Sequence, residues 1–227
     1  MRYLPVVCLC ALTFAAILFS PASAQSPALQ QGISVQLAPT SNAAAFPAAD
    51  RQDAWIIVVT ADGRLFFGIK PVTAGQLAEE MKITPRRRDA NLYIKADARV
   101  LFEWVGKALQ AALTDDFDSA VLLTDQDEPL APGKMVPPEG LEVALGSAPA
   151  EATVVQMHSS QGTQPTLKVN GAKVPMGSLK SSLEQALRGR TAKIVSLQVE
   201  DSLPFAQVAN VVDTCHSLGA KIVLATR

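Results

Sequence analysis

The sequence offers few side chains whose type and spacing would support catalysis. It contains two histidines, His158 and His216, and His216 directly follows Cys215. Neighbouring residues on a helix point about 100° apart, so Cys215 and His216 do not form a nucleophile–base pair or a pair of metal ligands. His158 precedes Ser159-Ser160-Gln161-Gly162 and is predicted to lie in a surface turn. We therefore predict that neither histidine is catalytic.

Motifs for metals and phosphates are also missing from the sequence. It has no Cys-x-x-Cys or His-x-x-x-His spacing, and no Gly-rich loop follows a predicted strand. Asp115, Asp116 and Asp118 cluster around Phe117, but they lack the central glycine of a calcium loop, so we interpret them as solvated loop charge. Cys215 lies on an apolar helical stripe and is predicted to be buried. We expect no catalytic, cofactor-binding or metal-binding residue, and hence no enzyme.

The tryptophans and the charged residues bear on the kind of partner. Trp55 begins a predicted strand and Trp104 lies on a predicted helix. Tryptophan is over-represented at binding hot spots, yet core packing is the default expectation for both. Arg86-Arg87-Arg88 is the only dense basic run and is interpreted as a solvated loop. With a formal net charge of −1, the chain has no basic field for binding nucleic acid.

A tandem repeat organises the elements that would position any site. Gly32-Ile33-Ser34-Val35-Gln36-Leu37 and Gly140-Leu141-Glu142-Val143-Ala144-Leu145 share one alternating pattern. More matches follow in order at an offset of about 102 or 103 residues. Val72, Gly75, Leu77, Leu92, Ile94, Asp97, Phe102 and Val105 correspond to Val174, Gly177, Leu179, Val195, Leu197, Glu200, Phe205 and Val208. Such an ordered series indicates a duplication.

Each copy is predicted to be a β-β-β-α-β-α-β unit. The predicted strands of the first copy are 33–37, 55–60, 65–67, 92–96 and 120–124, and those of the second copy are 141–145, 153–157, 166–169, 194–197 and 221–226. Asp62-Gly63 and Asn170-Gly171 are typical of tight turns. Thr73 and Gln76 predict a capping box at the start of the first helix.

The predicted fold class is α+β, with two tandem units. Two helices of about three turns each cannot cover both faces of the sheet, so each unit is expected to be a two-layer sandwich with two helices on one face of a sheet. The predicted domains are a first repeat over 32–125, a Pro-rich linker over 126–139 and a second repeat over 140–227.

The N-terminal segment resembles an export signal. Arg2 is followed by an apolar run over 3–19 and by Ala22-Ser23-Ala24, which predicts a signal peptide over 1–24. An uncleaved anchor is the alternative, since an apolar run of about 17 residues is at the short limit for a membrane span.

The unit is similar to the periplasmic domain of the ExbD/TolR family of biopolymer-transport proteins. The resemblance rests on residues 32–39, on 62–72, and on Ile94-Lys95-Ala96-Asp97 followed by Phe102-x-x-Val105; copy two keeps 170–174 and 198–208. The resemblance implies a homodimer-forming domain that contacts envelope proteins and is anchored by a transmembrane helix bearing an aspartate. Residues 1–24 contain no Asp or Glu, so we do not carry the proton-driven role over.

We expect a non-enzymatic periplasmic interaction module that binds envelope proteins of the ExbB/TolQ or TonB/TolA kind. The two copies are expected to form an intrachain pseudo-dimer, because a short linker holds them at a high effective concentration. The opening strands are the predicted partner-binding elements, through Ile33, Val35, Leu37, Leu141, Val143 and Leu145. One alternative is an inner-membrane-anchored accessory subunit of an ExbB/ExbD-type complex. Another is a domain that binds a small ligand.

Overall fold

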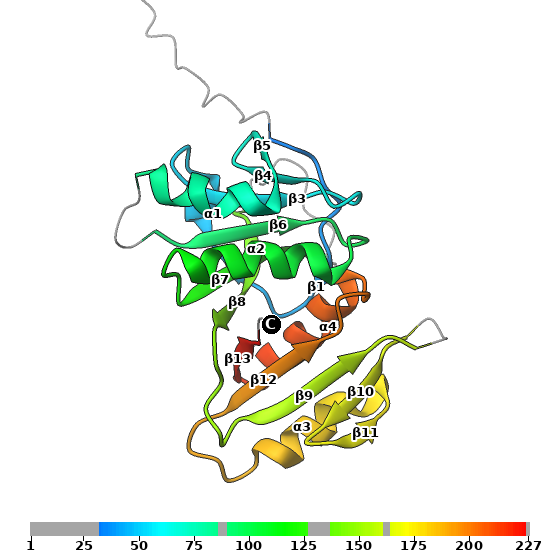
Figure 1. Cartoon of the computed structure of the whole chain (residues 1–227). Coiled ribbons are helices and arrows are strands. Elements are labelled where there is room, and N and C mark those ends of the chain that lie inside the picture. The colour runs from blue at the N-terminus through cyan, green and yellow to red at the C-terminus, as the bar shows by residue number, and fades with distance from the viewer. Residues whose placement is uncertain (1–31, 86–89, 127–136, 161–163, 226–227) are drawn as a thin grey trace, which may run out of the picture. The chain divides into compact units, whose positions relative to one another are not determined.

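A computed structural model describes residues 32–85, 90–126, 137–160 and 164–225 (Figure 1). These residues form a mixed α+β fold with four α-helices and one large mixed sheet of 13 strands. From Gly32 onward the chain forms one compact unit. The predicted signal segment, the basic run 86–88 and most of the predicted linker lie outside the described residues.

The strands and α-helices from β3 to β7 and from β9 to β13 follow the same order in the two halves of the chain. The first half contains β1 (Pro39–Thr40), β2 (Ala44–Ala45), η1 (Pro47–Asp50), β3 (Trp55–Val59), β4 (Leu65–Phe67), β5 (Lys70–Val72), α1 (Ala74–Ile83), β6 (Leu92–Ala96), α2 (Phe102–Thr114) and β7 (Ser119–Gln126). The second half contains β8 (Glu139–Leu145), β9 (Thr153–His158), β10 (Thr166–Val169), β11 (Ala172–Val174), η2 (Met176–Ser178), α3 (Leu179–Leu187), β12 (Ile194–Val199), α4 (Phe205–His216) and β13 (Lys221–Leu224).

One sheet runs through both halves, and β8 joins them. The strand order is β11-β10-β9-β12-β13-β8-β7-β6-β3-β4-β5, with β1 paired to β7 and β2 paired to β8. β8 runs antiparallel to β7 and parallel to β13. The predicted repeats therefore share a sheet rather than forming separate bodies.

Local sequence signals explain the helix starts and the turns. The hydroxyl of Thr73 accepts a hydrogen bond from the Gln76 amide, and the Gln76 side chain accepts one from the Thr73 amide, so the predicted capping box is confirmed. Asn170 and Gly171 both have positive φ, as the two-residue turn between β10 and β11 requires.

The predicted strand over 33–37 is wrong, because residues 32–38 form no strand. β7 pairs with β6 along one edge and with β8 along the other, so no full-length edge remains for an opening strand of the first half. Only the end of β7 is left, and the two-residue β1 pairs there with Asp125 and Gln126. Three further short strands, β2, β5 and β11, were not predicted.

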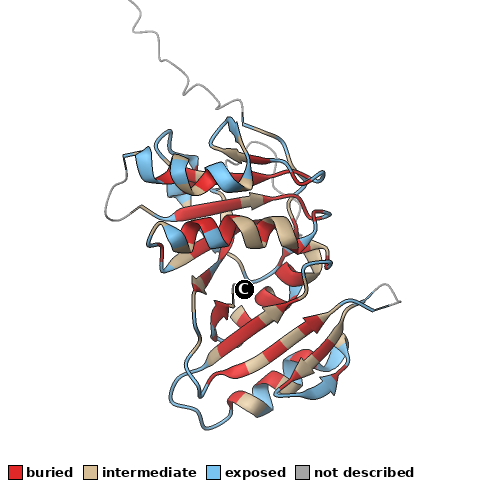
Figure 2. Cartoon of the chain, in the orientation of Figure 1, coloured by how far each residue is buried: buried red, intermediate tan, exposed pale blue. Residues whose placement is uncertain are grey.

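The core lies between the sheet and the helices. β9 and β10 alternate between buried and half-buried residues, whereas the central strands β3, β6 and β7 are buried at most positions (Figure 2). The helices bury one face each. The buried helical positions include Leu77 and Met81 in α1 and Leu179, Leu183 and Leu187 in α3, as their spacing predicted. Residues of both halves belong to one apolar cluster.

The opposite face of the sheet differs between the halves. In the first half, Tyr93, Val121 and Leu123 are covered by Phe46 and Ala49 from the segment around η1. In the second half, residues on this face include polar ones, and the Gln156 and Gln198 side chains hydrogen-bond across neighbouring strands at 3.0 Å.

Candidate partner-binding sites

The predicted partner-binding residues occupy two different environments. Leu141, Val143 and Leu145 are buried in β8, and both edges of that strand are paired. β8 therefore offers no free edge for strand addition, and partner binding through these three residues stays a prediction. Residues Ile33, Val35 and Leu37 are half-buried on an extended segment and alternate with exposed residues.

Asp97 anchors this extended segment to the end of β6. Its carboxylate accepts hydrogen bonds from the backbone amides of Gln36 (3.1 Å) and Arg99 (3.0 Å) and from the Arg99 guanidinium (2.8 and 2.9 Å). The Asp97 side chain is only 3% exposed. These bonds, the Arg99 side-chain bonds above all, lower the pKa of Asp97 from 3.8 to about 2. The Asp97 carboxylate is therefore ionised, and it holds the Gln36 backbone by accepting a hydrogen bond from its amide.

After its contact with Asp97, the N-terminal segment continues through residues 38–45 from the first half of the fold to the second. The Ala98 amide donates to the Gln36 carbonyl at 2.7 Å, and the Asp125 amide donates to the Ala38 carbonyl at 3.0 Å. The Asp213 carboxylate on α4 accepts from the Asn42 amide at 2.8 Å and from the Asn42 side chain at 2.9 Å. β2 then pairs with the start of β8. The segment thus fills the space between α4 and the end of β7.

Reciprocal hydrogen bonds connect the loops that lead into α2 and α4. The Phe102 amide donates to the Leu203 carbonyl, and the Phe205 amide donates to the Val100 carbonyl, both at 2.8 Å. Likewise the Glu103 amide donates to the Asp201 carbonyl (3.0 Å) and the Ala206 amide to the Ala98 carbonyl (2.9 Å). In each of these two pairs, the donor and the acceptor of one bond correspond to the donor and the acceptor of the other bond at an offset of 103 residues. Such self-complementary contacts are the pattern of a two-fold interface.

An apolar groove of about 790 Å³ lies beside the sheet edge in the first half. The β4–β5 hairpin, the first turn of α1 and the exposed side of α2 form its walls. Its lining includes Gly63, Phe66, Pro71, Val72, Gly75 and Trp104. We call it the Trp104 groove.

Packing holds Trp104 at the wall of this groove. The Lys107 ammonium lies 3.9 Å from the centre of the Trp104 ring and 2.6 Å from the Glu103 carboxylate. A Cβ atom on Gly63 would come within 2.5 Å of the indole, and Gly63 also has a φ of +79°. Only glycine fits both constraints. Trp55 is buried instead, against Phe67 and Phe117, as core packing predicts.

Cys215 and His216 are neighbours in α4, but their side chains lie in different surroundings. Cys215 is buried, as predicted, and this burial raises the pKa of its thiol to about 12. Nε2 of His216 lies 2.8 Å from the Glu142 backbone carbonyl. In the part of the chain that the structure describes, no three His, Cys, Asp or Glu residues are placed to hold a metal ion.

Glu200 occupies in the second half the position that Asp97 occupies in the first. It accepts hydrogen bonds from the Ser159 hydroxyl (2.6 Å), the Ser202 hydroxyl (2.7 Å) and the Ser159 amide (2.9 Å). These bonds, the Ser159 hydroxyl first, lower the pKa of Glu200 to about 2, and His158 lies 3.6 Å away. Glu200 thus holds the β9–β10 hairpin rather than an N-terminal segment.

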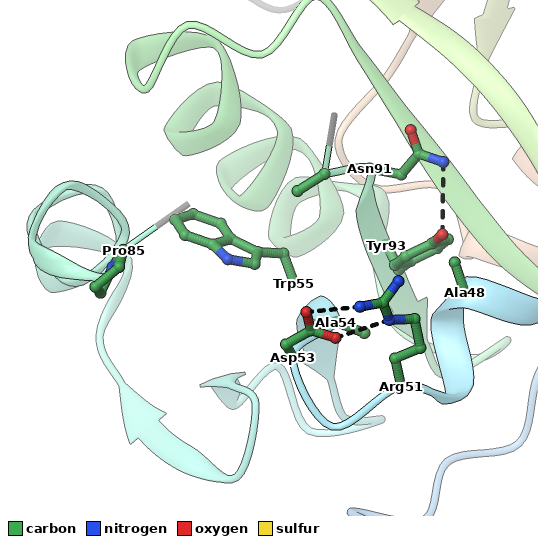
Figure 3. A pocket seen from close by; sticks show the side chains of 9 residues that line it. Ala48, Arg51, Asp53, Ala54, Trp55, Pro85, Asn91 and Tyr93 are labelled. Carbon is green, nitrogen blue, oxygen red and sulfur yellow. Dashed lines mark hydrogen bonds and ion pairs between the residues drawn. The ribbon is translucent and has the colours of Figure 1, made fainter. Parts of the chain in front are cut away.

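A smaller pocket of about 150 Å³ lies at the amino ends of β3 and β6 (Figure 3). Arg51 and Asp53 form a bidentate ion pair at 2.9 and 3.0 Å on one side of it. The Asn91 side-chain amide, also in the lining, lies 3.5 Å from the Tyr93 hydroxyl. Because these polar groups hydrogen-bond within pairs, they do not point together into the pocket as the groups of a ligand-binding site do.

Sequence reasoning identified Trp104 as a candidate but missed the groove around it. Asp213 and its bonds to Asn42 were also missed, because the two residues are distant in the sequence. Comparison with protein-family models, curated proteins and solved structures finds no match for the chain. Among the described helices, none is long and apolar enough to cross a membrane.

Proposed function

We propose that this chain is a non-enzymatic periplasmic protein-interaction module, related to the ExbD/TolR transport proteins, that binds envelope partners. The observation that carries the proposal is the Trp104 groove. It combines an aromatic anchor, apolar walls and a polar rim, which is the composition of protein-binding hot spots.

The proposal includes a tandem duplication of a β-β-β-α-β-α-β unit whose copies pair within one chain. Support comes from the ordered sequence matches, from the repeated order β3 to β7 and β9 to β13, and from the reciprocal bonds between the α2 and α4 loops. In each unit, we expect the two helices to cover one face of its strands. Pairing within one chain would make the dimer independent of protein concentration.

Binding in the groove is favoured over strand addition at the neighbouring sheet edge. β5 is the edge strand of the first half and has only three residues. Pro71 has no amide proton to donate, and Lys70 on the same strand is bound to Glu80 at 2.7 Å. Proline and lysine are typical of edges protected against strand pairing. A partner is therefore expected to insert a side chain beside Trp104.

The test compares two matched glycine variants for retention of envelope proteins. Gly75 lines the groove in α1, and Gly177 occupies the corresponding position in the second half. A Cβ atom meets nothing within 4 Å at either residue, so both variants are expected to fold. Gly75→Leu blocks the groove and should weaken partner binding roughly tenfold or more, whereas Gly177→Leu should not. Equal retention by both variants and the wild type would contradict a role for the groove.

A membrane-anchored accessory subunit is the second candidate, favoured by the apolar run over 3–19. It differs from the first candidate in the N-terminus of the mature protein. The mass of the protein from its native host, with fractionation into soluble and membrane pools, distinguishes them. A soluble protein starting at Gln25 supports the periplasmic module, and a membrane-bound protein starting at Met1 supports the subunit.

A further inference from the structure

The Trp104 groove differs in its chemistry from the corresponding surface of the second half. The two hairpins share one register, because Leu65 pairs with Val72 as Leu167 pairs with Val174. By this register and by the offset between α2 and α4, the groove residues Phe66, Pro71, Trp104 and Lys107 correspond to Lys168, Lys173, Gln207 and Asn210. The corresponding surface therefore lacks the aromatic and proline side chains of the groove, and each chain offers one site of this kind.

The charged residues in the lining of the groove are both cations, Arg64 and Lys107. Each of them has a carboxylate partner that lies outside the lining. Nε of Arg64 is 2.8 Å from the Asp62 carboxylate, and the Lys107 ammonium is 2.6 Å from the Glu103 carboxylate. Each ion pair therefore presents its positive end to the groove, and this favours a negatively charged occupant.

Both ion pairs leave room for a second carboxylate. The Arg64 side chain is 69% exposed and the Lys107 side chain is 37% exposed. Ion pairs with such exposure contribute little to stability, so a carboxylate of a partner can join or replace the internal one. Among the described residues, only Nε of the Arg64 guanidinium has a hydrogen-bond acceptor. The two terminal nitrogens of Arg64 are thus available to bind one carboxylate in a bidentate manner.

We propose that the Trp104 groove binds one acidic segment of a partner protein per chain, in which carboxylates flank an apolar side chain. The apolar side chain packs against Trp104 and Phe66. One carboxylate binds Arg64, and another binds Lys107. This inference rests on the proposed function, since it names the chemistry of the segment that occupies the groove.

Space and charge both favour this occupant over the alternatives. The volume of about 790 Å³ matches a ligand of several side chains rather than a single one. A basic segment would place like charges against Arg64 and Lys107, which lowers affinity. It would gain little from a cation–π contact, because the Lys107 ammonium already lies 3.9 Å from the centre of the Trp104 ring.

The experiment selects a display library of random short peptides on the immobilised full chain. The enriched peptides are then synthesised and titrated by calorimetry. They should combine an apolar residue with neighbouring carboxylates and should bind one per chain with a Kd below about 100 μM. Binding should weaken as NaCl rises from about 50 to about 500 mM, because salt screens exposed charges.

Matched variants separate the groove from general charge attraction. Arg64 and Lys173 are both exposed cations on the hairpins of their halves, so Arg64→Glu and Lys173→Glu change the net charge equally. Arg64→Glu should weaken binding about tenfold, whereas Lys173→Glu should leave it nearly unchanged. Gly75→Leu, which blocks the groove, should also weaken binding about tenfold or more.

The outcomes distinguish this inference from the proposed function. Peptides that Gly75→Leu blocks but that carry no acidic residue would overturn the inference and leave binding in the groove intact. Equal effects of Arg64→Glu and Lys173→Glu, or two peptides bound per chain, would do the same. A selection that yields no peptide blocked by Gly75→Leu would contradict the groove itself, and both proposals would fall.

Discussion

Replacing Asp97 with asparagine tests how the N-terminal segment is held. The Asp97 side chain is 3% exposed and accepts four hydrogen bonds, two of them from the Arg99 guanidinium. The pKa of Asp97 falls from 3.8 to about 2. Each pKa unit corresponds to about 1.4 kcal/mol, so the ionised carboxylate contributes about 2 kcal/mol to the free energy of unfolding at pH 7. Asp97→Asn should lower that free energy by a similar amount.

The pH dependence distinguishes this mechanism from a simple loss of packing. Because the folded-state pKa is lowered, the contribution is complete above pH 4 and is lost as the pH falls from about 4 towards 2. Urea denaturation of the wild type and of Asp97→Asn at pH 7 and pH 3 measures the difference in unfolding free energy. That difference should shrink at pH 3. Hydrogen exchange of the Gln36 and Ala98 amides should also become faster in the variant at pH 7.

Glu200→Gln is the matched control. Glu200 has a similarly lowered pKa and a corresponding position, but its side chain is 38% exposed and solvent screens its interactions. Glu200→Gln should therefore lower the free energy of unfolding less than Asp97→Asn does, and it should leave hydrogen exchange of the Gln36 amide unchanged. A stability difference for Asp97→Asn that stays constant between pH 7 and pH 3 would refute the reasoning.

Three further substitutions or reactions test separate features of the fold. Gly63→Ala should cost about 1–3 kcal/mol more than Gly68→Ala in thermal or urea denaturation, because both glycines have positive φ but only a Cβ on Gly63 would meet Trp104, at 2.5 Å. Equal costs would show that Trp104 moves away freely. Gly140→Ala should cost about 1–3 kcal/mol, since its Cβ would lie 2.6 Å from Val121 and 2.8 Å from the Leu122 carbonyl, whereas Gly177→Ala should be nearly neutral. A neutral Gly140→Ala would contradict the close approach of β7 and β8. Cys215, with its pKa raised to about 12 by burial, should resist thiol reagents at pH 8 and react fully in denaturant. Fast labelling of the native protein would place the thiol at the surface.

Local signals were sufficient to predict most helices and turns. The Thr73–Gln76 capping box and the Asn170–Gly171 turn each depend on a few adjacent residues, and both formed as predicted. Such features need little from the rest of the chain, because their hydrogen bonds and dihedral angles are set within one turn.

The opening segments show where local pattern is insufficient. Residues 33–37 and 141–145 have the same alternation, yet only the second forms a strand. One position exists between β7 and β13, and β8 occupies it. The sequence shows that both segments are suited to a strand, but only the arrangement of the whole sheet decides which one pairs. Gly140 permits the close contact of β8 with β7, but Gly32 occupies the same place in the other segment, so the glycine does not decide between them.

The Trp104 groove depends on contacts between distant residues and was beyond sequence reasoning. Trp104 was identified from its residue type alone, but its neighbours come from the hairpin around Gly63 and from the start of α1. Gly63 was interpreted only as a turn residue, although it also accommodates the indole ring. A single sequence cannot distinguish a glycine that only forms a turn from one that also makes room for a distant aromatic ring.

The central claim is that the two halves form one intrachain pseudo-dimer through the reciprocal loop contacts and β8. Backbone ¹⁵N relaxation of the full chain tests this most directly. The account predicts one rotational correlation time, appropriate to a monomer of the whole chain, for residues in β3 to β7 and in β9 to β13. Two shorter and different correlation times, one for each half, would contradict it.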